Sequence, residues 1–294
     1  MAVVDSLYEE GDVSVWKKAI AHFDIASGYQ DLQCGVDLMR EALAQGEPTN
    51  LNDSVSYYFC VSNLASLLCT QNHFEEVLRM ALDAMEPVKQ ISNFYYRSDL
   101  LSVLYETIVN AQTALLFMAQ ATRLFRTLAT QQMMPAEICT RINDALSGED
   151  NERGMFVTMF MGLVDLKTGH LDFCNAGHNP PVLVEEGNAE FIEMIPNAPI
   201  GLWPGLEYEG EEIESIMDRP LFIYSDGLNE AENRQQEQFT DERLLDILAH
   251  TPFVSARQTI EMLSAEVEKH RDGAEPNDDL TMLCVKVRKQ TEIQ

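Results

Sequence analysis

Hydrophobic residues recur with different spacings in the two halves of this chain of 294 residues. Up to about residue 112 they follow a helical period, and few runs alternate as a strand does. From about Met155 onward, short apolar or alternating runs are separated by Gly, Asn and Pro, which is typical of strands and turns. The pattern predicts a helical region over 1–112 and a second domain over 113–290 that mixes strands with helices.

The helical region is self-similar. The segments Ser62–Leu68 (SNLASLL) and Ser98–Leu104 (SDLLSVL) begin 36 residues apart, and aromatic residues precede both. Partner helices are expected from Gly35 (GVDLMREALAQ) and from Phe74 (FEEVLRMALDAM). Such a period, with small residues at helix contacts, predicts stacked helix pairs and resembles tetratricopeptide-like repeats. An ordinary helical bundle is the alternative. As repeats, this half would hold a peptide or a partner domain.

The second half predicts hairpins, two further strands and four helices. One hairpin is expected from Met155 to His178, with its turn at Lys167–Gly169, and another around Glu186–Asn188. LFIYSD and LTMLCVKVRK predict two more strands. Helices are expected from Leu115, Pro135, Asp241 and Ser255. Many antiparallel strands with a few helices indicate an α+β fold, with sheets covered by helices.

Charge narrows the classes of partner. The chain has 48 acidic and 20 basic residues and a net charge of −28. We therefore expect neither nucleic acid nor an anionic membrane as a partner, because no basic surface would neutralise phosphates. A cation or a basic protein fits better. We see no signal peptide and no apolar run approaching the ~20 residues that cross a bilayer. Six scattered cysteines then indicate reduced thiols in a cytoplasmic protein.

Two apolar strands meet acidic residues at their ends. Asp226 ends one strand, in Tyr-Ser-Asp-Gly, and Asp278–Asp279 begins another. If these strands are antiparallel neighbours, their carboxylates meet at one end of the sheet. Crowded carboxylates suit a hard divalent cation such as Mg²⁺ or Mn²⁺. From the pattern alone, a plain Asp-Gly turn and a solvated strand cap remain alternatives.

Several segments, taken in order, resemble one family of enzymes. They are the helix ALLFMAQATRLFRTLA, then PAEICTRINDAL, GMFVTMF, NAGHNPP, PIGLWPG, YSDGLNEA and DDLTMLCVKV. Over about Ala114–Arg288 this order and spacing is similar to that of the metal-dependent PPM-type serine/threonine protein phosphatases, in the branch of SpoIIE and RsbU. The resemblance implies a β-sandwich flanked by helices, with two Mn²⁺ or Mg²⁺ ions in a cleft at one edge.

The resemblance also implies roles for individual residues. Asp226 and Asp278 match metal ligands, and Asp279 and Gly227 would hold the geometry behind them. A metal-bound water, and no side chain, would attack the phosphorus of a phosphoserine or phosphothreonine. Asn175 and His178 match the family's NAGHNPP loop, where we expect a structural turn.

One departure from the family pattern weakens the expectation of activity. The family begins its domain with Gly-Asp-x-x-Asp and a hairpin bearing Gly-Asp-Val-Ser-Gly-Lys-Gly, directly before the helix that here reads ALLFMAQ. In that place stands YETIVNAQT, and neither motif precedes the helix. The nearest acidic replacements are Asp144, Glu149, Asp150 and Glu152, none in a matching frame.

The departure leads to two hypotheses. The first is metal-dependent dephosphorylation of a regulatory partner protein, with weak or no activity because acidic ligands are missing. The second is an inactive, phosphatase-derived module that binds proteins. A haloacid-dehalogenase-type enzyme is excluded because Asp226 lacks the second Asp that this chemistry needs two residues later. Missing strands also predict exposed apolar surface and self-association through an open sheet edge.

Overall fold

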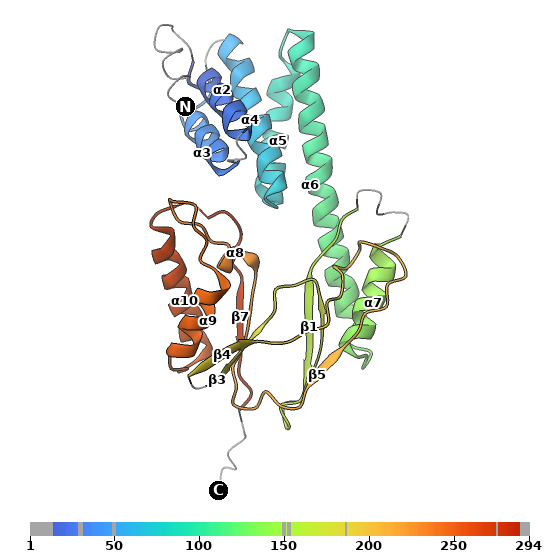
Figure 1. The fold of residues 1–294 in the computed structure, drawn as a ribbon. Coiled ribbons are helices and arrows are strands. Elements are labelled where there is room, and N and C mark those ends of the chain that lie inside the picture. The colour runs from blue at the N-terminus through green and yellow to red at the C-terminus, as the bar shows by residue number, and fades with distance from the viewer. Residues whose placement is uncertain are drawn as a thin grey trace. The chain divides into compact units, whose positions relative to one another are not determined.

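The computed structural model describes residues 14–28, 32–48, 51–148, 151, 154–185, 187–274 and 276–288. It divides the chain into two compact units, Met1–Leu116 and Phe117–Gln294 (Figure 1). The first unit is helical in its described part, and the second combines helices with two antiparallel sheets. This is the α+β class that the hydrophobic pattern predicts.

The first unit is built from consecutive helices that pack side by side. Their bounds are α2 Val15–Gly28, α3 Leu32–Leu43, α4 Leu51–Thr70, α5 Phe74–Lys89 and the first part of α6 Phe94–Leu128. The two similar segments lie in α4 and α6, and their expected partners lie in α3 and α5. Small buried residues such as Ala65, Ala81 and Ala84 line the contacts between helices. Their assignment as tetratricopeptide-like repeats stays a prediction.

The helix α6 is longer than expected, because it begins at Phe94 and not at Leu115. Among the described helices, it alone has the length and composition to cross a membrane. The expectation that no segment would meet this criterion was wrong for α6. Core helices of soluble proteins meet it as well, and Leu104 and Phe117 of α6 are buried within their respective units.

The second unit contains a three-stranded and a four-stranded sheet. The strands are β1 Met159–Val164, β2 Leu171–Ala176, β3 Val182–Glu185, β4 Asn188–Phe191, β5 Glu211–Ile213, β6 Leu221–Tyr224 and β7 Met282–Val285. Their orders are β1-β2-β5 and β4-β3-β6-β7, and every ladder is antiparallel. Both expected hairpins form, as β1–β2 and β3–β4. The short acidic strand β5 was not expected.

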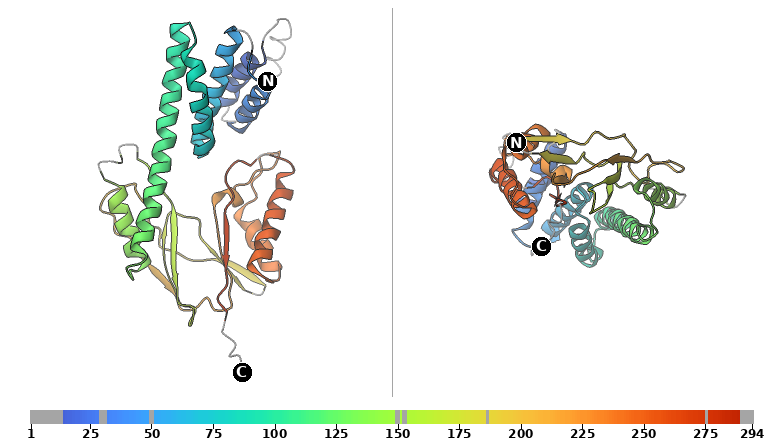
Figure 2. Two further views of the ribbon diagram at one scale, coloured as in Figure 1. Left: turned by 180° about the vertical axis from the view of Figure 1, so that it is seen from behind. Right: turned by 90° about the horizontal axis from the view of Figure 1, so that it is seen from below.

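Helices cover the outer faces of the two sheets (Figure 2). The end of α6 and α7 Pro135–Leu146 pack on the three-stranded sheet. The helices α9 Asp241–His250 and α10 Ala256–Arg271 pack on the four-stranded sheet. Between the sheets lies a core that includes Leu171, Phe173, Leu183, Ile216 and Leu221. The unit therefore has the layers of a sandwich flanked by helices.

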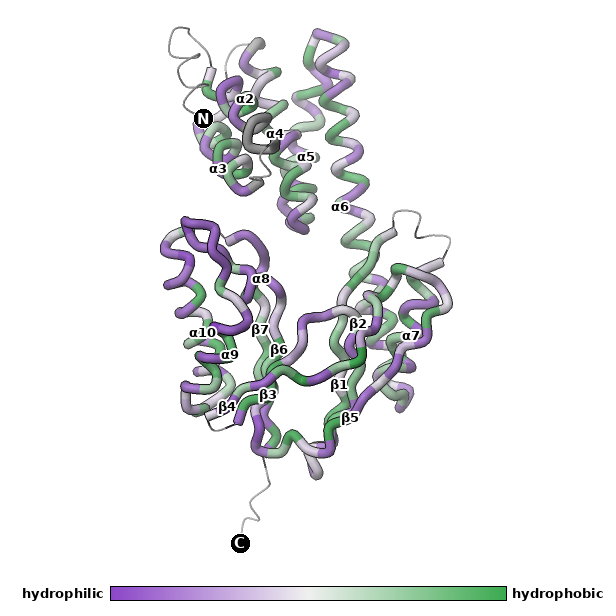
Figure 3. The backbone as a smooth tube through the Cα atoms, in the orientation of Figure 1, coloured by the Kyte–Doolittle hydropathy of each residue, from purple (hydrophilic) through white to green (hydrophobic). Residues whose placement is uncertain are grey.

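Each sheet has two edge strands, and β1 and β7 are the edge strands that lie beside an apolar groove. Among the described residues, β1 forms a ladder only with β2, and β7 only with β6. An apolar groove of about 440 Å³ lies between them and the end of α6, and Met118, Phe160, Ile223 and Leu283 help to line it. Both strands are mainly hydrophobic in sequence (green in Figure 3). Apolar surface is thus exposed beside the two free edges.

Candidate functional site

The pairing of β6 with β7 brings the predicted ligands together. Leu221, Phe222, Ile223 and Tyr224 lie opposite Val285, Cys284, Leu283 and Met282. The backbone N–H of Ser225 donates to the carbonyl of Thr281 at 3.0 Å, which extends the ladder by one step. Since the strands are antiparallel, the end of β6 and the beginning of β7 lie at the same end of the sheet. Asp226 and Asp278 flank this point.

The side chain of Ser225 fixes the approach to β7. Its hydroxyl donates to the carbonyl of Asp279 at 2.9 Å and accepts from the backbone N–H of Thr281 at 2.9 Å. We call this pair of bonds the Ser225 clamp. It ties the residue before Asp226 to the residue after Asp278, so the two carboxylate-bearing segments are held by backbone contacts.

Gly227 is required by the close approach of two backbones. A Cβ at this position would lie 2.5 Å from the carbonyl oxygen of Asp279 and 2.8 Å from its carbonyl carbon. Real Cβ atoms do not come so near, so a side chain at residue 227 would push the segments apart. The glycine of the Ser-Asp-Gly motif therefore sets the spacing between Asp226 and the start of β7.

Three carboxylates lie near this end of the sheet, but their oxygens do not all come within 4.8 Å of one another in the described structure. Asp226 begins the short helix α8 Asp226–Asn229, and Glu230 follows one turn later, its N–H donating to the Asp226 carbonyl at 2.9 Å. Partial burial raises the pKa of the Glu230 carboxyl, and the negative charges of Asp226 and Asp278 raise that pKa further. Glu230 is therefore a third carboxylate that interacts electrostatically with both predicted ligands. Sequence reasoning missed Glu230, although its spacing of four residues from Asp226 was a usable signal.

The donor atoms at the site suit a hard divalent cation. Carboxylate and amide oxygens are the ligands that Mg²⁺ and Mn²⁺ prefer. Asn277, directly before Asp278, donates through Nδ2 to the carbonyl of Glu230 at 2.8 Å. Its Oδ1 is buried and has no hydrogen-bond partner, so an acceptor beside the cluster remains unsatisfied. The residues fit such an ion.

The other predicted residues have different surroundings. Asp279 is exposed and contacts Ser225 and Gly227 through its backbone. Its N–H donates to Asp278 Oδ1 at 2.6 Å, which orients that carboxylate. Asp144 is exposed on α7, over the other sheet. Glu149, Asp150 and Glu152 lie outside the described residues.

The NAGHNPP loop is closed by its own side chains. Asn175 is buried, accepts from the N–H of His178 at 2.9 Å and donates to the His178 carbonyl at 2.8 Å. Asn179 then reaches α8, donating to Asn229 Oδ1 at 3.3 Å. These bonds give Asn175 the turn-forming role that the sequence predicts.

Part of a missing motif does occur elsewhere in the chain. Residues 11–14 read Gly-Asp-Val-Ser, which are the first four letters of the family's second acidic motif. They lie about 100 residues upstream of ALLFMAQ, away from the place where the family carries this motif. Residues 11–13 fall outside the described part of the chain. Asp12 is therefore a candidate acidic residue on sequence alone.

Comparison with known proteins gives distant relatives. Protein IcfG of Synechocystis is 24% identical over 233 residues, which cover 68% of this chain and 36% of that protein. Phosphoserine phosphatase RsbP of Bacillus subtilis is 21% identical over 168 residues, which cover 56% of this chain and 40% of that protein. The chain thus spans well under half the length of these two relatives.

A solved structure and a family model agree with this result. The PP2C phosphatase domain of SpoIIE from Bacillus subtilis, solved with a fragment of its regulatory domain, superposes with a TM-score of 0.51 at 17% identity. The match covers 58% of this chain and 50% of that one, and it shows a shared fold. The model of the family Stage II sporulation protein E matches residues 112–288, more than half of the chain. The chain belongs to the SpoIIE family.

Proposed function

We propose that this protein is a metal-dependent phosphatase that acts on phosphoserine or phosphothreonine of a regulatory partner protein. The family supports a regulatory, phosphatase-like role. The observation that carries the finer proposal is the placement of Asp226 and Asp278 at the same end of the β6–β7 ladder, with Glu230 nearby. Neighbouring carboxylates favour a divalent cation between them, and a cation bound there could contact a phosphate group.

The chemistry assigned to each residue follows from its position. Asp226 and Asp278 would hold Mn²⁺ or Mg²⁺, which supplies a water acidic enough to attack phosphorus near neutral pH. The backbone of Asp279 and the absent side chain of Gly227 keep the two carboxylates at a fixed spacing.

We expect turnover to be slow. The family places further acidic ligands in two motifs that this chain lacks directly before its ALLFMAQ helix. With fewer carboxylates the cation binds less tightly, and fewer charges orient it. The alternative function, an inactive protein-binding module, is favoured by the free edges of β1 and β7 and by the apolar groove beside them.

Hydrolysis of a small phosphate ester separates the two functions. We expect slow hydrolysis of p-nitrophenyl phosphate that requires Mn²⁺ and is lost in Asp226→Asn. The matched control is Asp144→Asn, which changes an exposed carboxylate over the other sheet. Activity in both variants would point to a contaminant, and no Mn²⁺-dependent activity in the unchanged protein would leave the binding module as the function.

We further propose that the chain works in the cytoplasm with protein partners, without nucleic acid or membrane. The helical unit would dock a regulatory protein through tetratricopeptide-like pairs. The second unit would self-associate through the free edges of its sheets, since unpaired strands readily pair with another chain.

Leu283→Lys tests this self-association. Leu283 is exposed on β7 and lines the apolar groove, so a lysine there should shift the mass measured by light scattering toward the monomer. The control Leu166→Lys changes a leucine in the β1–β2 turn that is more exposed, at 74% against 52% for Leu283, and it should leave the mass unchanged. A monodisperse, unchanged monomer that binds no hydrophobic dye would contradict the idea.

A further inference from the structure

A second group of metal-binding side chains lies on the three-stranded sheet. His170 directly precedes β2, and Asp172 follows two residues later. Residues two apart on a strand point to the same face of the sheet. On β5, Glu212 lies directly opposite Asp172 in the ladder. Strand alternation and register therefore bring one imidazole and two carboxylates to a single face.

The distances between these groups resemble those in a metal site. His170 Nε2 lies 3.4 Å from Asp172 Oδ1 and 3.7 Å from Glu212 Oε2. One ligand atom from each of the three residues lies within 4.8 Å of the other two. In a tetrahedral zinc site with bonds of about 2.0–2.1 Å, neighbouring ligand atoms are about 3.3 Å apart. Small side-chain rotations would complete such a site without backbone movement.

Charge adds a reason for a cation at this place. Like charges directly opposite each other across two strands destabilise the pairing, and Asp172 and Glu212 are such a pair. A cation between them removes the repulsion. An imidazole nitrogen in the set favours zinc over Mg²⁺, which prefers oxygen ligands alone.

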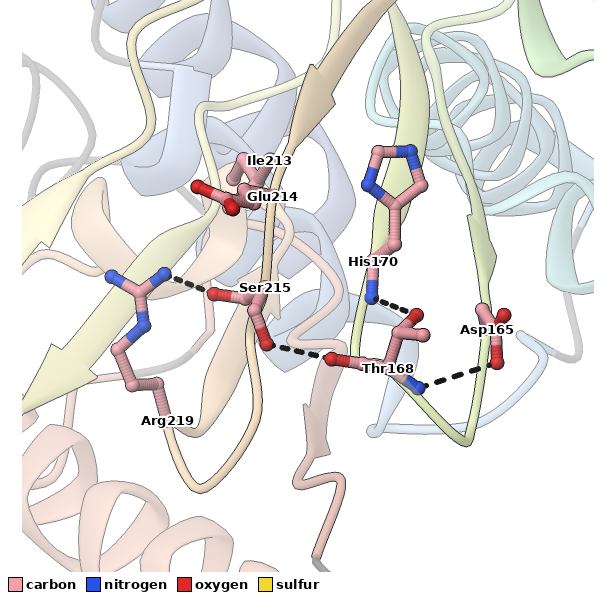
Figure 4. A pocket seen from close by; sticks show the side chains of 7 residues that line it. All are labelled: Asp165, Thr168, His170, Ile213, Glu214, Ser215 and Arg219. Carbon is pink, nitrogen blue, oxygen red and sulfur yellow. Dashed lines mark hydrogen bonds between the residues drawn. The ribbon is translucent and has the colours of Figure 1, made fainter.

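Neighbouring residues brace the turn that carries His170. The three side chains of His170, Asp172 and Glu212 remain accessible to water. The N–H of His170 donates to Thr168 Oγ1 at 3.1 Å, and Ser215 Oγ donates to the Thr168 carbonyl at 2.8 Å. Figure 4 shows these bonds bracing the turn, while the imidazole points away from it beside an open pocket. The side chains of His170 and Glu212 are 34% and 73% exposed, so a metal ion could enter and keep water ligands.

We propose that His170 Nε2, with one oxygen each from Asp172 and Glu212, binds a Zn²⁺ ion whose remaining position is filled by water. The site is formed by β2 and β5, whereas the proposed phosphatase site is formed by β6 and β7. The two metals can therefore be tested one at a time. The competing account is that a protonated His170 bridges two carboxylates and no metal binds.

Zinc titration by calorimetry at pH 7.5 tests the proposal. We expect the unchanged protein to have a zinc site whose affinity falls at least tenfold in His170→Gln and in Glu212→Gln. The control is His250→Gln, since His250 Nδ1 lies 3.1 Å from Asp246 Oδ1 but has no second carboxylate in the described structure. This variant should bind zinc as the unchanged protein does.

Glu212→Gln keeps the test independent of folding, because the Glu212 side chain is mostly exposed. Its thermal unfolding without zinc should stay within a few degrees of that of the unchanged protein. Zinc binding of equal strength in all three variants, or none in the unchanged protein, would overturn the proposal. Loss of phosphatase activity alone would leave it standing.

Discussion

Two acidic clusters in the same unit differ in how their ligands are held. At the end of β6 and β7, Asp226 and Asp278 are positioned by backbone contacts, through the Ser225 clamp and the close approach at Gly227. On β2 and β5, strand alternation places His170 and Asp172 on one face of the sheet, and the bonds at Thr168 brace only the turn before them. Metal binding at the first cluster should therefore respond to changes at Ser225 and Gly227, which are not ligands themselves. Metal binding at the second cluster should respond only to changes of its own ligands.

The clusters also differ in how their negative charge is balanced. Near Asp226, partial burial raises the pKa of Glu230, and the negative charges of neighbouring carboxylates raise that pKa further. Around Asp172, the imidazole Nε2 of His170 lies 3.4 Å from Asp172 Oδ1. The first cluster thus contains carboxylates alone, whereas the second includes an imidazole.

The largest effect is expected for Gly227→Ala. The new Cβ would meet the Asp279 backbone at 2.5 Å, so we expect a loss of about 2–3 kcal/mol in the free energy of unfolding by urea. Gly148→Ala is the control, because a Cβ there meets nothing within 4 Å. Equal stabilities of the two variants would contradict the close approach of Gly227 to the Asp279 backbone. They would also contradict the idea that backbone contacts position Asp226 and Asp278.

The next effect comes from paired serine variants. Ser225→Ala removes both bonds of the clamp and Ser215→Ala removes the bond to Thr168, so each should cost about 1–2 kcal/mol of stability. Only Ser225→Ala should also weaken Mn²⁺ binding, as measured by calorimetry. If Ser215→Ala weakened it equally, the two clusters would not be independent.

The smallest effect, of opposite sign, is expected for Glu230→Gln. The raised pKa means that the folded protein holds this proton more tightly than the unfolded chain does. The corresponding stability is complete below the ordinary pKa of 4.5 and is lost as pH rises through the raised value. Without metal at pH 7, Glu230→Gln should therefore melt at a higher temperature than the unchanged protein.

Two further measurements check that Glu230→Gln raises the melting temperature. At pH 4 the difference in melting temperature should shrink, because Glu230 is then largely protonated. The exposed Glu193→Gln variant should melt unchanged at both pH values. A lower melting temperature for Glu230→Gln at pH 7 would show that the carboxylates do not repel one another in the folded protein.

The local pattern of hydrophobic and turn residues was enough to predict much of the second unit, Phe117–Gln294. Alternating residues and turn glycines gave both hairpins, and the apolar runs at LFIYSD and LTMLCVKVRK gave the strands that meet at Asp226. The helix at Pro135 was also predicted to its last residue, Leu146. In each of these elements the signal lies in neighbouring residues.

What the sequence did not predict depends on contacts between distant segments. The strand β5, Glu-Glu-Ile, is too short and acidic to be recognised, and it forms only because it pairs with β2. Glu212 therefore could not be placed opposite Asp172 in advance. The Ser225 clamp likewise joins residues more than fifty positions apart, and no local pattern indicates it.

Mn²⁺ titration by calorimetry of the unchanged protein, Asp278→Asn and His170→Gln tests most directly whether the end of β6 and β7 is a metal site. We predict one Mn²⁺ site in the unchanged protein that persists in His170→Gln and is lost in Asp278→Asn. Mn²⁺ binding of equal strength in Asp278→Asn, or no binding to the unchanged protein, would contradict this account.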